Sequence, residues 1–260
     1  MRLLILTQKE NLYLPSAFAN VCEALDPEIV CIVAAPAMST HGGQLRGLIK
    51  HVRLFGLKGT LVLTSRVLAA KTRDRFNCKS TTGCFHSIRF VAQAFDIPYY
   101  EIDRVKGLEF QNLIDKYRPE LLVSISCPQI IGKNVRKQFS KGCINVHGAP
   151  LPRYRGLMPA FWALRFDEKT TAVTVHEISD RLDNGDILNQ REIAIGSEET
   201  WDSLVRKSKA IGSEALIETI KQIKNGSVIR RENPDEQATY FSFPTTQDRK
   251  AFLAAGKRFF

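Results

Sequence analysis

Short apolar runs alternate with helix-like segments through the first half of the chain. The runs expected to form buried strands are RLLILT (2–7), EIVCIVAA (28–35), IPYYEI (97–102), ELLVSIS (120–126) and CINVH (143–147). The segments with helical periodicity are 15–25, 109–117 and 131–139. Because consecutive parallel strands need a crossover connection, this alternation predicts a parallel sheet with helices on both faces.

The pattern changes after Thr170. Two strand-like runs, TAVTVHEI (171–178) and DILNQREIAI (186–195), flank a polar, glycine-containing turn and predict an antiparallel addition to the sheet. An amphipathic helix is expected over 200–224, followed by a tail rich in proline and charge. We therefore expect an α/β fold with a catalytic domain over residues 1–200 and a helix-and-tail extension over 201–260 packed on it.

The composition of the 260-residue chain, with 44% hydrophobic and 25% charged residues, is that of a globular protein with a core. No apolar run reaches the roughly 20 residues of a membrane-spanning helix, and the amino terminus lacks the features of a signal peptide. The cysteines form no CxxC pair, which favours a reducing cytoplasmic location over a disulfide framework. Cys78, Cys84 and His86 match no common zinc-site spacing, so no metal is expected.

Lysine and arginine outnumber acidic residues by 37 to 27, a net charge of +10 that favours anionic partners. Basic residues are concentrated in the segment 44–75, where they alternate with leucine, valine and phenylalanine. The simplest interpretation is a solvated helical face. The alternative is a surface for an anionic partner, whether lipid, nucleotide or phosphate, so a peripheral membrane contact through 44–75 stays open.

The residues best suited to chemistry lie at the end of the fifth predicted strand. Ligands collect at the carboxyl ends of parallel strands, and Asn145 and His147, two residues apart, project to the same side there. A primary amide and an imidazole supply a hydrogen-bond donor and a base, the groups needed for acyl transfer to an amine. A lone histidine in an apolar strand is more often structural, so the pair alone does not decide the function.

A later segment, EISDRLDNGDIL (177–188), strengthens the interpretation. Its turn crowds Asp180, Asp183 and Asp186 around a glycine and cannot bury all three carboxylates. A carboxylate brought beside His147 would fix the tautomer of the ring and stabilise its charged form. Sequence spacing alone does not establish that the two groups meet.

Taken in order, these motifs resemble the folate-dependent formyltransferase family. The matching features are Asn-x-His, then Leu-Pro and a glycine, then a Thr-Val-His strand and Leu-Asp-x-Gly, within residues 95–200. The resemblance implies a Rossmann-like domain with a catalytic triad of Asn145, His147 and Asp183. One departure follows the histidine, because Ala149 stands where the family commonly has serine. We expect a hydroxyl at the rim of the site to be missing.

The resemblance further implies 10-formyltetrahydrofolate as co-substrate, bound across the strand ends. The residues expected to contact it are Gln129, Ile130, Ile131, Asp180, Arg181 and Leu182. An amine of the acceptor would attack the formyl carbon while Asn145 and His147 stabilise the formyl oxygen. Asp183 would orient His147 and help to take the proton that the amine loses.

The acceptor is inferred by comparing classes within the family. Methionyl-tRNA formyltransferases carry an additional carboxyl-terminal domain, for which the tail after the long helix is too short. Glycinamide ribonucleotide formyltransferases have a glycine-rich phosphate loop after the first strand, where this chain has TQKENLYLPS. We therefore expect N-formylation of a nucleotide-linked amino-dideoxy sugar, as in the GDP-perosamine type of enzyme that serves O-antigen and lipopolysaccharide synthesis.

Cationic and hydroxyl side chains near the strand ends are the candidate contacts to a nucleotide sugar. They are Lys9, Thr82 in the turn 80–83, Arg153, Arg155 and His176. For the two arginines the alternative is a solvated loop or a salt bridge to the aspartate-rich turn, and for His176 it is a structural role. The expected partners are folate and the nucleotide sugar, without nucleic acid.

Other functions and the assembly remain open at this point. The chain could be a methionyl-tRNA formyltransferase-like enzyme acting on another amine, or a non-catalytic module that binds membrane or nucleic acid. By analogy with sugar formyltransferases, we expect a homodimer formed through the hairpin after Thr170 and the helix that follows it.

Overall fold

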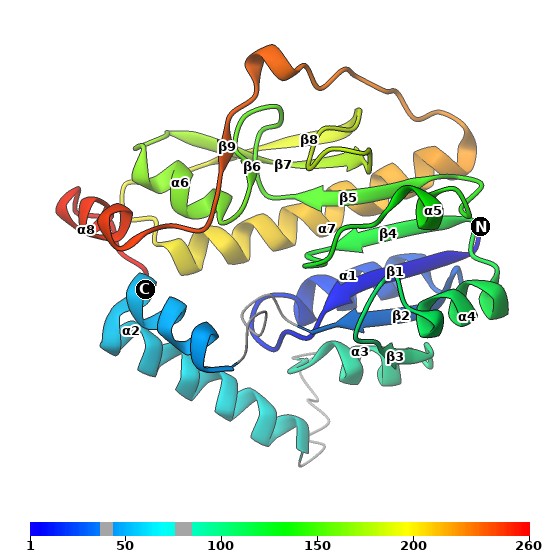
Figure 1. The fold of residues 1–260 in the computed structure, drawn as a ribbon, viewed down its shortest axis with the longest axis horizontal. Coiled ribbons are helices and arrows are strands. Elements are labelled where there is room, and N and C mark those ends of the chain that lie inside the picture. Colours follow the sequence, from blue (N-terminus) through cyan, green and yellow to red (C-terminus); the bar gives the residue numbers. More distant parts are fainter. Residues whose placement is uncertain (37–43, 76–84) are drawn as a thin grey trace.

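A mostly parallel β-sheet runs through the centre of the protein (Figure 1). A computed structural model describes residues 1–36, 44–75 and 85–260. Over these residues the main sheet has the strand order β3-β2-β1-β4-β5-β7-β8. Its strands are β1 (Leu3–Gln8), β2 (Ile29–Ala35), β3 (Tyr99–Glu101), β4 (Leu121–Ile125), β5 (Cys143–His147), β7 (Thr170–Glu177) and β8 (Ile187–Ala194).

The direction of the strands follows the predicted pattern. β1 to β5 run parallel, whereas β7 pairs antiparallel with β5 and β8 pairs antiparallel with β7. The central strands β1 and β4 are buried along almost their whole length because both of their faces are covered, and most of their residues are apolar. The predicted α/β fold, a parallel sheet with an antiparallel addition, is confirmed.

Helices cover the two faces of the sheet. α1 (Pro15–Leu25), α3 (Ile88–Ala94) and α7 (Trp201–Asn225) share a hydrophobic core with one face. α4 (Leu108–Tyr117) and α5 (Lys133–Arg136) pack on the other. α7 approaches the sheet closely at Gly212, where an added Cβ would lie 3.2 Å from Val146 and Val173. Because side chains alternate along a strand, Asn145 and His147 project from the face of β5 opposite α7.

A second core, rich in aromatic side chains, lies beside one end of the sheet. It joins α2 (Gln44–Arg75), α6 (Pro159–Arg165), α8 (Thr246–Ala254) and the first turn of α7. Phe161 stacks on Phe252 with their ring centroids 4.9 Å apart. The short strands β6 (Arg155–Gly156) and β9 (Tyr240–Phe241) pair in parallel nearby. The carboxyl-terminal tail is thereby attached to the segment that follows β5.

Three differences from the predicted elements have local causes. The helix expected over 131–139 is reduced to Lys133–Arg136, with turns beyond it. The tail contains α8, which begins with a capping box between Thr245 and Asp248, and a 3₁₀ turn at Asp235–Gln237. The pattern does not predict α3 and α6, which at seven residues each are too short for a helical period to stand out.

Candidate active site

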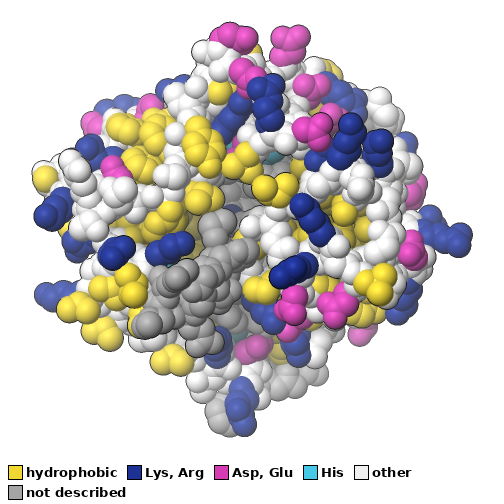
Figure 2. Space-filling model, in the orientation of Figure 1, with side chains coloured by type: hydrophobic (Ala, Val, Ile, Leu, Met, Phe, Trp, Pro, Cys, Tyr) yellow, Lys and Arg dark blue, Asp and Glu magenta, His cyan; other side chains and the backbone are white. Residues whose placement is uncertain are grey.

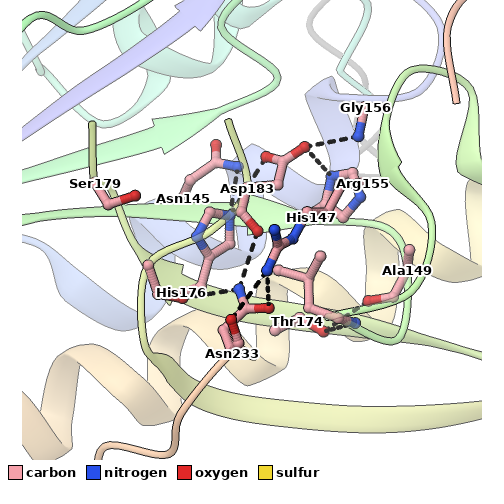
Figure 3. A network of polar contacts seen from close by, with 12 residues as sticks. Asn145, His147, Ala149, Arg155, Gly156, Thr174, His176, Ser179, Asp183 and Asn233 are labelled. Carbon is pink, nitrogen blue, oxygen red and sulfur yellow. Dashed lines mark hydrogen bonds and ion pairs between the residues drawn. The ribbon is translucent and has the colours of Figure 1, made fainter. Parts of the chain in front are cut away.

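Asn145 and His147 lie at the carboxyl end of β5, where a polar network fills the edge of the sheet (Figure 3). The pairing of β5 with β7 sets Asn145 opposite His176, and Asn145 Nδ2 is 3.2 Å from His176 Nε2. His147 is buried, and its Nε2 is 2.8 Å from the carbonyl oxygen of Tyr154. The strand register therefore brings an amide and two imidazoles together.

Asp183 closes this group from the loop between β7 and β8. Its Oδ2 lies 3.6 Å from His147 Nδ1, and its Oδ1 lies 3.6 Å from His176 Nε2 (Figure 3). The backbone N–H of Gly156 donates a hydrogen bond to Oδ2 at 2.9 Å. Of the three aspartates in the loop, Asp183 is the buried one, and Asp180 and Asp186 are exposed. The structure thus brings together the three side chains that the resemblance assigns to catalysis.

Asn233, from the tail, holds the Asp183 loop in place. Its Nδ2 donates to the carbonyl oxygens of Asp183 and Gly185 at 2.9 and 3.0 Å. Arg155 Nη2 in turn donates to the backbone oxygen and to Oδ1 of Asn233, at 3.0 and 2.8 Å. Gly185 must be glycine, because a Cβ there would lie 2.0 Å from the carbonyl oxygen of Glu177. Sequence reasoning missed Asn233, since no local pattern marks a side chain that acts 50 residues away in the chain.

The charges of the site follow from its burial and contacts. Burial alone would raise the pKa of the Asp183 carboxyl, but His147, His176 and the Gly156 amide outweigh it and hold the pKa well below 3.8. Burial lowers the pKa of His147 below 6.5, against the opposing effects of Asp183 and the Tyr154 carbonyl. At neutral pH the pair is therefore an aspartate ion beside a neutral imidazole.

The tautomer of His147 follows from its contact with Tyr154. A carbonyl oxygen can only accept, so the 2.8 Å contact requires that Nε2 carry the ring proton. Nδ1 of the neutral ring then has no proton and faces the Asp183 carboxylate. A proton taken up by His147 would bind at Nδ1, where Asp183 stabilises the resulting cation.

Arg136 joins the two loops that were expected to bind the donor. Its guanidinium donates to the carbonyl oxygen of Ile131 at 2.7 Å and also pairs with Asp180. Ile130 in the first loop is 75% exposed, and Leu182 in the second is 52% exposed. Exposed apolar side chains therefore come from two segments that one arginine holds together. Arg136 was not among the predicted site residues, because a basic residue in a basic segment gives no distinct signal.

The remaining donor-site candidates are held by the protein itself. Gln129 Nε2 donates to Asp103 O at 2.8 Å, and Gln129 Oε1 accepts from the Val105 amide at 2.9 Å. Arg181 pairs with Asp235 at 2.5 Å. The Gln129 side chain thus fixes its own loop.

The acceptor-site candidates are dispersed. Lys9 Nζ lies 2.5 Å from Glu101 Oε2, and Arg153 Nη1 lies 3.1 Å from Glu168 Oε1. Arg155 is buried and bonded to the tail, as described above, and not to the aspartate-rich turn. His176 lies within the Asp183 network. Of these candidates, His176 is the one that contacts the triad.

Some candidates fall outside the described residues. These are Thr82 and the turn 80–83 around it, together with Cys78 and Cys84. Within the described ranges, no group of three His, Cys, Asp or Glu side chains is arranged to hold a metal ion. Cys22, Cys31, Cys127 and Cys143 are free thiols.

Ala149, two residues after His147, does not lie at the rim of the site as we expected. Ala149 is fully buried and packs in the aromatic core, so a hydroxyl there would not stand at the rim of the site. Its carbonyl oxygen accepts a 2.6 Å bond from the Thr174 hydroxyl, which also accepts from the Leu151 amide at 3.3 Å. The turn after β5 is thus held by the buried Thr174 on β7.

The loop after β1 carries a carboxylate in an unexpected role. Glu10 Oε1 accepts a hydrogen bond from the Leu12 amide at 2.7 Å. Glu10 Oε2 accepts from the amides of Tyr13 and Leu14 at 2.8 and 2.7 Å. These amides lie just before α1, where helix N-termini attract anions. A side chain of the protein therefore already fills this anion-binding position.

Comparison with known families identifies the family to which the chain belongs. The family model described as formyl transferase matches residues 70–220, more than half of the chain. The chain belongs to the formyl transferase family. Asn145, His147 and Asp183 all lie within the matched residues, whereas most of α2 precedes them and Asn233 follows them.

Curated relatives of this formyl transferase family member include methionyl-tRNA formyltransferases. The methionyl-tRNA formyltransferase of Acetivibrio thermocellus is 38% identical over 145 residues, which cover 56% of this chain and 47% of that protein. That of Caldanaerobacter subterraneus subsp. tengcongensis is 37% identical over 176 residues, 67% of this chain and 57% of that protein. The chain spans about half the length of the curated relatives it matches.

A solved structure resembles nearly the whole chain. The N-formyltransferase of Helicobacter canadensis, in complex with folinic acid and dTDP-3-aminofucose, has a TM-score of 0.61 at 16% identity. The similarity covers 98% of this chain and 80% of that one. At this identity the likeness shows a shared fold.

Proposed function

We propose that the protein is an N-formyltransferase. It takes the formyl group of 10-formyltetrahydrofolate and transfers it to the amino group of a nucleotide-linked amino-dideoxy sugar. The observation that carries this proposal is the position of the Asp183 carboxylate, 3.6 Å from His147 Nδ1, at the sheet edge that also holds Asn145. Family membership supports the same chemistry.

The three side chains suit the two needs of formyl transfer, which are to stabilise the formyl oxygen and to accept a proton. The Asn145 amide has two N–H groups, of which one meets His176 and the other remains for a ligand oxygen. His147 would exchange its bond to the Tyr154 carbonyl for the formyl oxygen as charge develops there. The carbon–nitrogen bond to the acceptor forms, the bond to folate N10 breaks, and the proton lost by the amine passes through His147 beside Asp183 to N10.

The donor is assigned to the strand-edge loops linked by Arg136. The exposed Ile130 and Leu182 side chains offer apolar contacts for a flat pteridine ring. The Helicobacter canadensis relative, whose solved structure contains folinic acid, supports a folate site on this fold.

Glu10 bears on the choice of acceptor. Its carboxylate already occupies the amides before α1, so a phosphate of glycinamide ribonucleotide would have to displace a charged side chain there. The relative crystallised with dTDP-3-aminofucose supports a nucleotide sugar as the acceptor.

A second acceptor, methionyl-tRNA, is favoured by a separate observation. The curated relative at 38% identity is a methionyl-tRNA formyltransferase, and the chain carries a net charge of +10. This chain matches only 47% of the length of that relative, so the match does not establish that the two proteins share an acceptor.

The test is a direct comparison of acceptors with the full chain. The release of tetrahydrofolate from the formyl donor is followed with GDP- and dTDP-linked amino-dideoxy sugars, glycinamide ribonucleotide and methionyl-tRNA. We expect the best sugar to exceed methionyl-tRNA in kcat/KM by at least about a hundredfold. Turnover with methionyl-tRNA alone would show that the acceptor is the tRNA and not a sugar. An absence of turnover with every amine would refute an enzymatic function and favour a binding module.

Two variants test the site itself. Asn145→Ala and His147→Ala each remove a group that stabilises the formyl oxygen, and kcat should fall by about a hundredfold to a thousandfold. Asn225→Ala, which changes an exposed asparagine at the end of α7, is the control and should keep its turnover. Unchanged kcat in both site variants, with normal thermal unfolding, would refute the assignment.

A further inference from the structure

The long helix α2 exposes an unusual amount of apolar side chain. Within the described residues, six large hydrophobic side chains on this helix are exposed. They are Leu48, Ile49, Leu57, Leu61, Val62 and Leu68. Three of them, Leu57, Leu61 and Leu68, are 73%, 69% and 59% exposed. Their spacing of four and seven residues sets them on one side of the helix, where they form a leucine stripe.

The opposite side of α2 is anchored to the aromatic core, so the stripe does not result from a loosely placed helix. Phe55 lies 5.0 Å from the rings of both Trp201 and Phe259, centroid to centroid. Arg66 pairs with Asp202 at 2.9 Å and stacks over Phe260. The helical dihedrals are interrupted at Gly56 (φ 71°, ψ 177°), so the Arg66 contacts are the ones that fix which face of residues 57–75 points outward.

Exposed basic side chains lie on the same helix, toward both ends of the leucine stripe. The segment 44–75 has eight basic residues and one acidic residue, so it holds seven of the ten net positive charges of the chain. Among the side chains of this helix that the structure describes, the exposed bases are Lys50, Arg53, Lys58, Lys71, Arg73 and Arg75. In Figure 2 hydrophobic and basic side chains lie side by side over the lower left, where Figure 1 places α2.

We propose that α2 docks the protein on the surface of an anionic lipid bilayer, with the leucine stripe in the interface and the basic side chains on the headgroup phosphates. Three leucines on the outward face of α2, with lysine and arginine on the same exposed side, give this surface the chemistry that binds an anionic membrane interface. No helix in the described ranges is long and apolar enough to cross a membrane.

Charge argues against the other occupants of this face. A second copy seated on the stripe would bring two strongly positive helices together, each with Asp74 as its one acidic residue. A nucleic acid would satisfy the bases but leave three leucines against phosphates and sugars. The family match begins at residue 70, so the stripe lies outside it and the inference is independent of the catalytic site.

The experiment measures sedimentation of the full chain with vesicles. One set contains equal parts of phosphatidylglycerol and phosphatidylcholine, and the other contains phosphatidylcholine alone. The wild-type protein should bind the anionic vesicles at least about tenfold more strongly, and binding should weaken as salt is raised. The triple variant Leu57→Gln, Leu61→Gln, Leu68→Gln should lose binding at least about tenfold, because glutamine keeps the helix and removes the apolar face.

A second variant separates charge from apolar contact. Lys58→Glu with Lys71→Glu keeps all three leucines and should remove the preference for anionic vesicles. The controls are Leu108→Gln with Ile229→Gln, which alter equally exposed apolar side chains elsewhere, and Lys137→Glu with Lys221→Glu. Both controls should bind like the wild type, and circular dichroism checks that each variant is folded.

Three results would overturn the proposal. The first is an absence of binding to anionic vesicles at low salt. The second is vesicle binding that the leucine variant leaves unchanged. The third is a wild-type dimer in sedimentation velocity, or a complex with RNA homopolymer, that forms in place of vesicle binding.

Discussion

Two carboxylates near the strand ends, Glu10 and Asp183, show how the same group can serve opposite purposes. Glu10 accepts three backbone N–H groups, at 2.7, 2.8 and 2.7 Å. Asp183 accepts one backbone N–H at 2.9 Å and faces two imidazoles at 3.6 Å. A backbone amide does not titrate, whereas an imidazole gains and loses protons near neutral pH. The partners therefore make Glu10 a structural cap and Asp183 a group linked to proton transfer.

The two carboxylates also differ in how far along the chain their partners lie. The amides that Glu10 binds belong to the next four residues, so its contacts are set locally. Asp183 depends on Gly156 and His147, 27 and 36 residues earlier, and its loop depends on Asn233, 50 residues later. A local cap tolerates change elsewhere, whereas the Asp183 site exists only when several distant segments are assembled.

The largest effect is expected from Asp183→Asn. The amide keeps the shape of the carboxylate and can still accept the Gly156 N–H, but it cannot stabilise a charged His147. We expect kcat to fall by about a thousandfold or more with little change in thermal unfolding. Asp186→Asn, in the same loop but exposed, is the matched control and should retain its turnover. Equal losses of kcat in the two variants would show that Asp183 has no special role in the reaction.

The next largest effect is expected from Gly156→Ala, and it is a loss of folding stability. Gly156 has φ +101°, and a Cβ there would lie 2.2 Å from the carbonyl oxygen of Phe241. The β6–β9 pairing and the amide that binds Asp183 would both shift, at a cost of about 3 kcal/mol of unfolding free energy. Denaturant unfolding measures this cost. Gly196→Ala has open space around it and should change the stability little, so similar losses in both would contradict the steric explanation.

The sequence predicts the parts of this architecture that depend on local pattern. The first helix is expected over 15–25 and found at Pro15–Leu25, because Phe18, Val21, Cys22 and Leu25 recur at helical spacing on its buried side. Asn145 and His147 are recognisable because their strand ends at once in a glycine. Asp183 is singled out only through the family resemblance, since pattern alone leaves three aspartates equivalent.

Long-range contacts are what the sequence does not reveal. Asn233 and Arg155 support the Asp183 loop through the tail, and no periodicity connects segments 78 residues apart. Arg136 joins two loops across 44 residues. The cap made by Glu10 is local, yet it has no signature of its own because it replaces a glycine-rich loop by side-chain bonds. Contacts formed only after folding therefore mark the limit of prediction from pattern.

The burial of His147 predicts how the stability of the folded protein changes with pH. The folded protein holds His147 below its ordinary pKa of 6.5, so the unfolded chain binds more protons than the folded one as pH falls through this value. The stability contributed by the neutral ring is fully present above about pH 6.5 and is lost toward the lower folded-state pKa. Denaturant unfolding at pH 7.5, 6.5 and 5.5 should show a shallower decline for His147→Gln than for the wild type. A decline of equal slope would mean that the ring is not held neutral.

The smallest effect is expected from Glu10→Gln, and it completes the comparison with Asp183→Asn. The glutamine oxygen can still accept from two of the three amides before α1, but its NH₂ group would face the third. The loss of one bond and of the charge at a helix start should cost about 1 kcal/mol of unfolding free energy. The partners of Glu10 in these three hydrogen bonds are backbone amides, which do not take part in proton transfer. We therefore expect kcat to stay within about twofold of the wild type. A kcat loss approaching that of Asp183→Asn would mean that Glu10 takes part in the reaction, and that its backbone partners do not define its role.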